Sequence, residues 1–375
     1  MSRCVLRLAL AVLTAGAALA LPCAALAHKS SDAYLVLSAD GAVFAGHWDI
    51  ALRDLELAVG LDANADGRVT WGELRAQRVA IDAYALSHLH ATAAGEACTA
   101  RVSKHQVDRH TDGAYAVLEL EIACPTDAAL VLGYDLLFAL DPQHRGLLRI
   151  EARGTTTSAV FSPASPRFAQ SAAPRAWRAF ADFTREGVWH IWTGVDHVLF
   201  LLCLLLPAVM QRVGGAWRPV PRGRDAARET LRVVTAFTLS HSLTLALGAL
   251  GAIALPSRFV EAAIAASIVI TALDNVHPFL RAPRTAVAFG FGLVHGLGFA
   301  SVLTDLGLPV ASRAIALLGF NLGVEFGQLA IVGVVLPLAL GLRRAALYPP
   351  LALAGGSLIV SAIASVWLWQ RALGA

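Results

Sequence analysis

The second half of the chain consists largely of apolar runs that are long enough to cross a lipid bilayer. The chain has a mean hydropathy of +0.61, and only 15% of its 375 residues are charged. A membrane-spanning helix needs about 20 mostly apolar residues, and lipid tolerates only structures that satisfy their own backbone polar groups. We therefore predict an all-α transmembrane bundle over residues 188–375, with six spans near residues 188–210, 231–254, 258–279, 285–304, 312–341 and 350–370.

The charged residues between these runs predict the orientation of the bundle. Arginines gather in every second loop, whereas the other side has only Arg258, Arg313 and Arg371. Because cytoplasmic loops are rich in Lys and Arg, the arginine-rich loops are expected inside and both chain termini outside. The inner arginines are Arg212, Arg218, Arg222, Arg224, Arg228, Arg232, Arg281, Arg284, Arg343 and Arg344.

The first 27 residues are interpreted as a signal peptide, which agrees with that orientation. Arg3 and Arg7 begin a positive region, an apolar run follows, and the tripeptide at 25–27 fits the cleavage rule for small residues. The mature chain is then expected to begin at His28 outside the cytoplasm. The predicted location is the inner membrane of a bacterium, with lipid as the main partner and, given a net charge of only +3, no nucleic acid.

Residues 28–153 are predicted to form an exported, mainly-β domain. Apolar and polar residues alternate over 33–37, 43–50, 114–122 and 129–134, with Asp-Gly turns between runs, which indicates an antiparallel β-sandwich. Cys98 and Cys124 are the two cysteines of this region, so an oxidising compartment favours a disulfide between them. Residues 154–175 are expected to be a linker and 175–187 an amphipathic helix on the outer membrane surface.

A twelve-residue segment inside the exported domain, 62–73, matches the calcium loop of an EF-hand at every position. The pattern requires oxygen ligands at fixed spacing, a glycine for the sharp turn (Gly67), and a final glutamate that binds with both oxygens. Flanking helices are expected over 51–60 and 73–90, and the site is interpreted as one bound Ca²⁺ with a structural or tuning role. The predicted ligands are Asp62, Asn64, Asp66, the carbonyl of Arg68, Thr70 and Glu73.

Ionisable side chains recur within the apolar runs, where each is costly and therefore indicates a functional site. His190 and His197 are seven residues apart, which is two helical turns, so both are expected on one helix face, with Asp196 beside His197. Nitrogen and oxygen ligands of this kind suit a divalent transition metal or a proton relay, and hydrogen bonds between helices are the structural alternative. The other candidates are His241, Asp274, His277, His295, Asn321 and Glu325.

A short pattern, F-x-L-x-H-x-L, occurs twice in these runs. It covers 237–243 and 291–297, and each copy is followed by a helix that carries Val-Glu. The pattern indicates a parallel repeat of two hairpins with a substrate site at their interface, and chance similarity between apolar segments explains it equally well.

On these residues the chain resembles the HupE/UreJ family of membrane proteins. His190, Asp196 and His197 match its H-x5-D-H signature, and blocks at 237–242, 295–300 and 320–325 resemble further motifs of the branch with a large exported domain. The resemblance covers about 186–340 and implies permeation of nickel or cobalt, linked to the maturation of hydrogenase and urease. Two features differ from the smaller members, which have proline where this chain has Ile191 and lack the exported domain.

The leading hypothesis is therefore a permease for a divalent transition metal, Ni²⁺ or Co²⁺ first, and not an enzyme. His190 would capture the ion at the outer mouth, and Asp274 with His277 would serve the inner exit. The transit site would comprise Asp196, His197, His241, His295 and Glu325, with His295 and Glu325 close together. The alternatives are an intramembrane metalloenzyme, or a calcium-stabilised accessory or scaffold of the cell envelope that works with a maturation partner and transports nothing.

Overall fold

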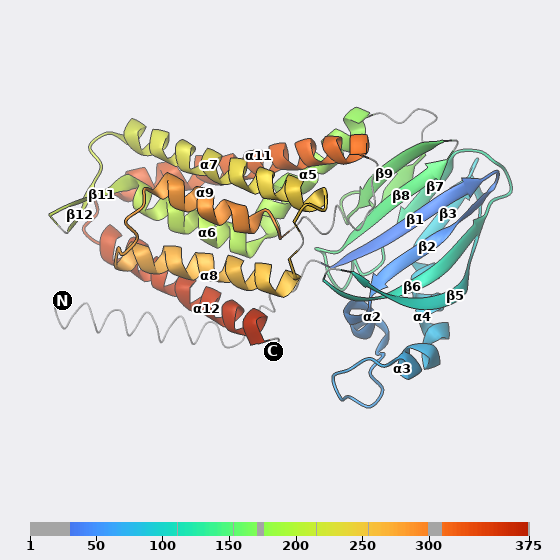
Figure 1. Cartoon of the computed structure of the whole chain (residues 1–375). Coiled ribbons are helices and arrows are strands. Elements are labelled where there is room, and N and C mark those ends of the chain that lie inside the picture. Colours follow the sequence, from blue (N-terminus) through green and yellow to red (C-terminus); the bar gives the residue numbers. More distant parts are fainter. Residues whose placement is uncertain are drawn as a thin grey trace. The chain divides into compact units, whose positions relative to one another are not determined.

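The structure is a computed structural model that describes residues 31–110, 112–152, 154–170, 176–214, 216–253, 255–298 and 310–373. The chain divides into two compact units, a strand-rich unit and a helical unit, with the boundary between Phe183 and Thr184 (Figure 1). The predicted signal peptide, 1–27, and His28 lie outside the described residues.

Six strands form the larger sheet of the strand-rich unit, in the order β5-β6-β2-β1-β8-β9. The expected runs at 33–37, 43–50 and 114–122 are strands β1, β2 and β6 of this sheet. The prediction of a purely antiparallel domain is wrong, because β8 pairs with β1 in parallel and the sheet is mixed. The strands are β1 (Asp32–Asp40), β2 (Val43–Ala51), β5 (Thr99–His110), β6 (Gly113–Ala123), β8 (Arg145–Ala152) and β9 (Thr155–Phe161).

The smaller sheet has the order β10-β7-β3-β4 and shares a hydrophobic core with the larger one. Trp48 of β2 contacts Tyr134 of β7 across this core, with ring centroids 5.6 Å apart. Cys98 and Cys124, at the ends of β4 and β6, are joined by a disulfide. The strands are β3 (Leu89–Ala93), β4 (Glu96–Ala97), β7 (Leu130–Tyr134) and β10 (Arg167–Ala169).

The segment expected to be a linker is largely folded into the two sheets. Strand β9 pairs with β8 through a tight turn at Gly154, whose φ of +73° suits glycine, and β10 pairs with β7. The prediction for 155–169 is therefore wrong. The cause is composition: runs of Thr and Ser are typical of loops, but here they form an edge strand of the larger sheet in which most residues are half-buried.

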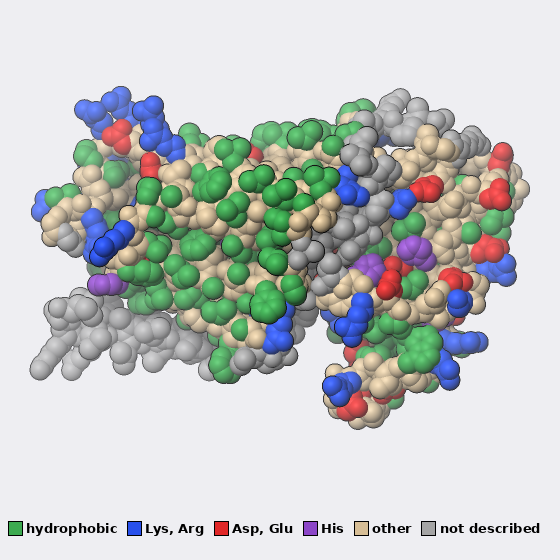
Figure 2. Space-filling model, in the orientation of Figure 1, with side chains coloured by type: hydrophobic (Ala, Val, Ile, Leu, Met, Phe, Trp, Pro, Cys, Tyr) green, Lys and Arg blue, Asp and Glu red, His purple; other side chains and the backbone are tan. Residues whose placement is uncertain are grey.

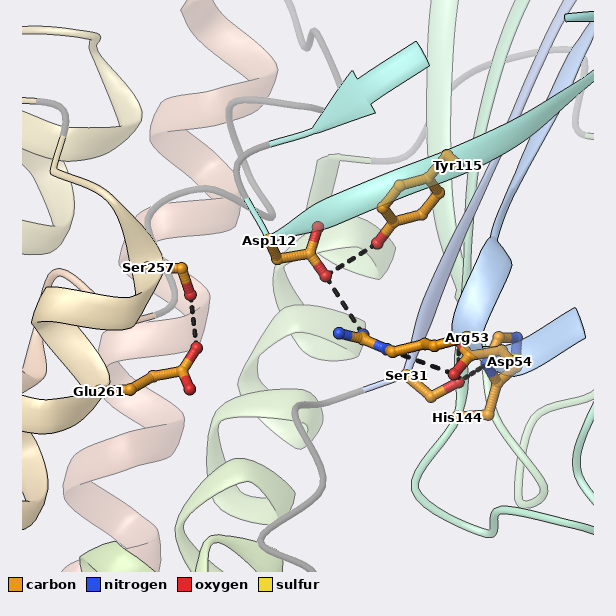
Figure 3. A network of polar contacts seen from close by, with 8 residues as sticks. All are labelled: Ser31, Arg53, Asp54, Asp112, Tyr115, His144, Ser257 and Glu261. Carbon is orange, nitrogen blue, oxygen red and sulfur yellow. Dashed lines mark hydrogen bonds and ion pairs between the residues drawn. The ribbon is translucent and has the colours of Figure 1, made fainter. Parts of the chain in front are cut away.

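A buried chain of polar side chains connects β1, α2 (Leu52–Val59), β7 and the start of β8. Figure 3 shows Ser31 between Asp54 and His144: its hydroxyl donates to Asp54 Oδ2 at 2.8 Å and lies 2.6 Å from His144 Nδ1. Tyr134 Oη lies 2.7 Å from His144 Nε2. Since the Ser31 proton goes to Asp54, His144 donates through Nδ1 and accepts at Nε2, which is the neutral form.

Burial lowers the pKa of His144 to about 3, which makes the domain sensitive to acid. The imidazole takes up a proton near pH 6.5 only when the chain unfolds, so its contribution to stability is present above that pH and is lost as the pH falls towards 3. Between pH 7 and pH 5 the loss is about 2 kcal/mol. We expect urea unfolding of the strand-rich unit in the full-length protein to show this dependence, and His144→Gln to remove it. An equal pH dependence in His144→Gln would contradict the prediction.

Seven helices of the helical unit are described, together with two short non-α helices and a hairpin. The α-helices are α5 (Ala176–Thr193), α6 (Val195–Leu205), α7 (Gly223–Ala249), α8 (Ser257–Val276), α9 (Arg284–His295), α11 (Val310–Leu342) and α12 (Gly356–Leu373). The 3₁₀ helix η1 (Leu206–Val209) and the hairpin of β11 (Met210–Val213) and β12 (Ala216–Pro219) follow α6, and the π-helix η2 (Tyr348–Gly355) precedes α12.

Four helical stretches are long and apolar enough to cross a membrane, and the bent pair of α5 with α6 makes a fifth. They are Gly223–Ala249, Ser257–Val276, Ser312–Leu342 and Tyr348–Ala372. Six spans are not confirmed. The fourth predicted span, 285–304, corresponds to α9, which has only 12 residues, and its remainder extends beyond the described residues.

The distribution of hydrophobic and basic side chains on the helical unit is the one expected for a protein that spans a bilayer. Figure 2 shows hydrophobic side chains over the visible face of the helices and basic side chains gathered around hairpin β11–β12 and the start of α7. Trp217 of that hairpin lies under Arg212 and near Arg284, with guanidinium carbons 5.5 and 6.0 Å from its ring centroid. This arginine-rich end is the one predicted to face the cytoplasm.

Glycines bring the backbones of neighbouring helices into contact. A Cβ on Gly292 of α9, or on Gly296 directly after it, would collide with the α7 backbone near Phe237 and His241. Gly187 of α5 and Gly323 of α11 face each other in the same way. These contacts are of the small-residue type that drives helix association in membranes, and they fix the helices that carry the buried histidines.

Candidate metal centre

A sharp bend between α5 and α6 brings His190 and His197 together. The two helices meet at 70° around Gly194, and the two imidazole centroids are 4.7 Å apart. In one continuous helix, residues seven apart would be about 10.5 Å apart along the axis. The expectation of a shared helix face is therefore wrong: the break makes the contact. Gly194 is required there, because a Cβ would lie 2.6 Å from His190 O and 2.8 Å from His197 Nδ1.

Asp196 orients His197. Its Oδ1 accepts the backbone N–H of His197 at 2.9 Å and lies 3.0 Å from His197 Nδ1. A carboxylate in this position holds the proton on Nδ1 and leaves the lone pair on Nε2, an arrangement common behind metal-binding histidines. The structure thus gives Asp196 an orienting role beside the predicted transit site.

His241 of α7 completes a group of three imidazoles. One ring nitrogen each from His190, His197 and His241 lie within 4.8 Å of one another. Ligands about 2.0–2.1 Å from one ion stand roughly 3–4 Å apart, so a small contraction would close the group around a metal. His241 is fully buried and His197 is 7% exposed, whereas His190 is half-buried, so the helices enclose two of the three imidazoles.

His295 lies next to this group and is held by Ser267 of α8. The Ser267 hydroxyl donates to Ile264 O at 2.6 Å, so its oxygen accepts the Nε2–H of His295 at 2.9 Å. The lone pair of His295 is therefore on Nδ1. The His295 ring centroid is 5.3 Å from that of His197, which makes His295 a fourth imidazole of the cluster.

The imidazoles of the cluster have unsatisfied nitrogens. His197 Nε2, His295 Nδ1 and both ring nitrogens of His241 are buried without a hydrogen-bond partner among the described residues. Each such group costs about 1–3 kcal/mol. Buried polar atoms are ordinarily paired, so this concentration indicates a ligand that the nitrogens bind.

Helix α11 contributes amide and carboxylate oxygens on one face. Asn321 lies near His241, and its Oδ1 and Glu325 Oε2 are buried without a hydrogen-bond partner among the described residues. One turn further, Thr238 of α7 donates to Gln328 Oε1 at 3.0 Å. The predicted closeness of His295 and Glu325 is not confirmed: the described contacts of His295 are with α6, α7 and α8.

Asp274 and His277, predicted to form an inner exit, lie at the end of α8. Asp274 Oδ1 accepts the backbone N–H groups of Phe279 and Leu280, each at 2.8 Å. The carboxylate therefore closes the turn after α8, and His277 is exposed at the helix end. A role for this pair in ion exit remains a prediction.

The predicted calcium loop lies between α2 and α3 (Trp71–Ala76). Asp62 accepts from the amides of Asp66 and Gly67 at 3.2 and 2.7 Å, and Gly67 has a φ of +78°. Glu73 reaches back to Thr70, whose N–H it accepts at 2.8 Å. Hydrogen bonds from the Thr70 backbone and side chain, then from the Asn64 and Ala63 amides, lower the pKa of Glu73.

The sequence alone did not identify two residues that shape the site, Gly194 and Ser267. Gly194 could have been identified from the sequence, because a glycine between two histidines inside an apolar run favours a break in the helix. Ser267 was not, because a serine inside a span is most often a partner in helix packing.

Buried histidines between apolar, glycine-packed helices define a membrane protein with a candidate site for a transition metal. A family model described as HupE / UreJ protein matches residues 167–371, which is more than half of the chain. The protein therefore belongs to the HupE/UreJ family, and its apolar helices fit a multi-pass membrane protein. No curated protein gives a match.

Gly194→Ala should weaken metal binding, because the added methyl group pushes His190 and His197 apart. We expect the Kd for Ni²⁺ to rise at least about tenfold, or 1.4 kcal/mol, in calorimetry of the purified protein. Gly290→Ala is the matched control, since a Cβ there meets no atom within 4 Å. Equal affinities in the two variants would contradict the role of the bend.

Proposed function

We propose that the helical unit conducts a divalent transition-metal cation through the cluster of His190, His197, His241 and His295. The observation that carries the proposal is the convergence of ring nitrogens from His190, His197 and His241, which lie within 4.8 Å of one another. His197, His241 and His295 in addition have buried nitrogens without a hydrogen-bond partner among the described residues. Neutral imidazoles suit a path through lipid because they offer lone pairs without carrying charge of their own.

The donor set supports a narrow choice of metals. Imidazole nitrogen suits Ni²⁺, Co²⁺, Zn²⁺ and Cu²⁺, whereas Mg²⁺ and Ca²⁺ prefer oxygen. Nickel or cobalt is the first choice because the chain belongs to the HupE/UreJ family, whose members are generally associated with transport of these metals. Asp196 supports the role in a second way, because its negative charge beside His197 offsets part of the cost of a divalent ion at membrane depth.

His197→Ala should abolish uptake of Ni²⁺ or Co²⁺ into proteoliposomes. The change removes a lone pair on Nε2 that the cluster cannot replace, and wild-type protein should accumulate the metal above protein-free vesicles. His88→Ala, in the strand-rich unit, is the control and should transport normally. Undiminished uptake by a correctly inserted His197→Ala protein would remove the cluster from the path.

A second candidate function is a metal-binding accessory of the membrane that transports nothing. It is favoured by the closed surroundings of the cluster: the cavity beside His197 has a volume of only about 10 Å³. The same proteoliposomes separate the two functions, because an accessory would bind metal in detergent and show no uptake.

We further propose that the loop 62–73 binds Ca²⁺ and stabilises the exported domain. Oxygen ligands at this spacing, the turn at Gly67 and helices on both sides support it. Binding to the folded state alone would raise stability by about 2.7 kcal/mol at a hundredfold excess over Kd.

Glu73→Gln should remove most of this stabilisation, since one neutral amide replaces the carboxylate that closes the loop. We expect calcium to raise the melting temperature of the strand-rich unit in the full-length wild type and to leave that of Glu73→Gln nearly unchanged. The control variant is Glu96→Gln, because Glu96 lies in the short strand β4 and outside the loop. The same melting temperature with calcium and with chelator in wild type would exclude the site.

A further inference from the structure

Three helices repeat one arrangement in which a phenylalanine stands one turn from a clustered histidine. In each case the phenylalanine is on the side of the arginine-rich end, because α6 runs towards that end while α7 and α9 start from it. Two of the three pairs belong to the repeated F-x-L-x-H-x-L pattern. The pairs are Phe200 with His197, Phe237 with His241, and Phe291 with His295; we name these three aromatic residues the phenylalanine layer.

The rings of the phenylalanine layer pack against one another on the arginine-rich side of the histidine cluster. The Phe200 ring centroid is 5.4 Å from that of Phe237 and 6.0 Å from that of Phe291. The His295 ring contacts two of these rings: its centroid is 4.9 Å from that of Phe200 and 5.3 Å from that of Phe237. Phe200 and Phe237 are only 2% and 3% exposed, so the rings fill the space between the helices.

The cavity beside the layer is lined mainly by apolar side chains, with His197 and Gln328 as its polar members. Leu201, Leu204 and Val234 surround the cavity of about 10 Å³, which has room for one water at most. The nearby Thr238 and Gln328 are hydrogen-bonded to each other. The cavity therefore has no room for a hydrated cation or for a chain of waters that relays protons.

We propose that the phenylalanine layer is a hydrophobic gate, closed in this structure, that seals the metal path below the histidine cluster. Apolar constrictions block ions because water leaves them, and a metal permease needs such a seal to keep protons from leaking through its site. The proposal rests on the proposed function, since a gate implies a path. In this proposal Phe200 and Phe237 control passage along the path and do not bind the ion.

The test is proton leak into proteoliposomes that contain a pH-sensitive dye, driven by a potassium diffusion potential with no transition metal present. Phe237→Gln and Phe237→Met introduce side chains of nearly equal size, and only the first is polar. We expect Phe237→Gln to raise the leak at least about tenfold over wild type by wetting the layer, and Phe237→Met to stay tight. Phe320→Gln is the matched control, because Phe320 is also fully buried but contacts His190, above the layer.

Equal leak in the two Phe237 variants, no leak in either, or the same leak in Phe320→Gln would overturn the gate. Should Phe237→Gln not purify as a monodisperse protein, the pair Phe200→Gln and Phe200→Met makes the same comparison. Metal uptake by wild type is a separate measurement: its absence would count against the proposed function, whereas the leak comparison addresses the gate alone.

Discussion

The cost of burying imidazole nitrogens among apolar helices is the constraint on which the helical unit depends. Lipid offers no water to satisfy them, and the close glycine contacts between α7 and α9 leave no room for other partners. Asp196 and Ser267 each hold one imidazole through one ring nitrogen and leave the lone pair on the other. The packing that makes the helices stable therefore also prepares the nitrogens for a ligand.

The break at Gly194 is the second device that shapes the centre. The two helices α5 and α6 meet there at 70°. Because of this bend, the side chains of His190 and His197, which are seven residues apart in the sequence, are in direct contact. The phenylalanine layer and the adjacent histidines follow from a separation of about one helical turn on three helices. The metal binding and the water exclusion that we propose would thus belong to separate layers of one bundle.

Much of this organisation was predictable from the sequence, for identifiable physical reasons. The apolar runs, the alternating strands and the histidines depend on local pattern, and the family membership confirms the resemblance seen in His190, Asp196 and His197. The parallel pairing of β8 with β1 and the folding of 155–169 depend on tertiary pairing, which local composition misjudged. The contact of His295 with Ser267 likewise arises only when helices pack, so the role of His295 could not be assigned beforehand.

The most direct test of the account is the nickel-edge X-ray absorption spectrum of the purified full-length protein with one equivalent of Ni²⁺. The histidine cluster predicts at least three imidazole nitrogens around the metal, because His190, His197 and His241 converge within 4.8 Å. A spectrum dominated by water oxygens or by the sulfur of Cys203 would contradict the central claim.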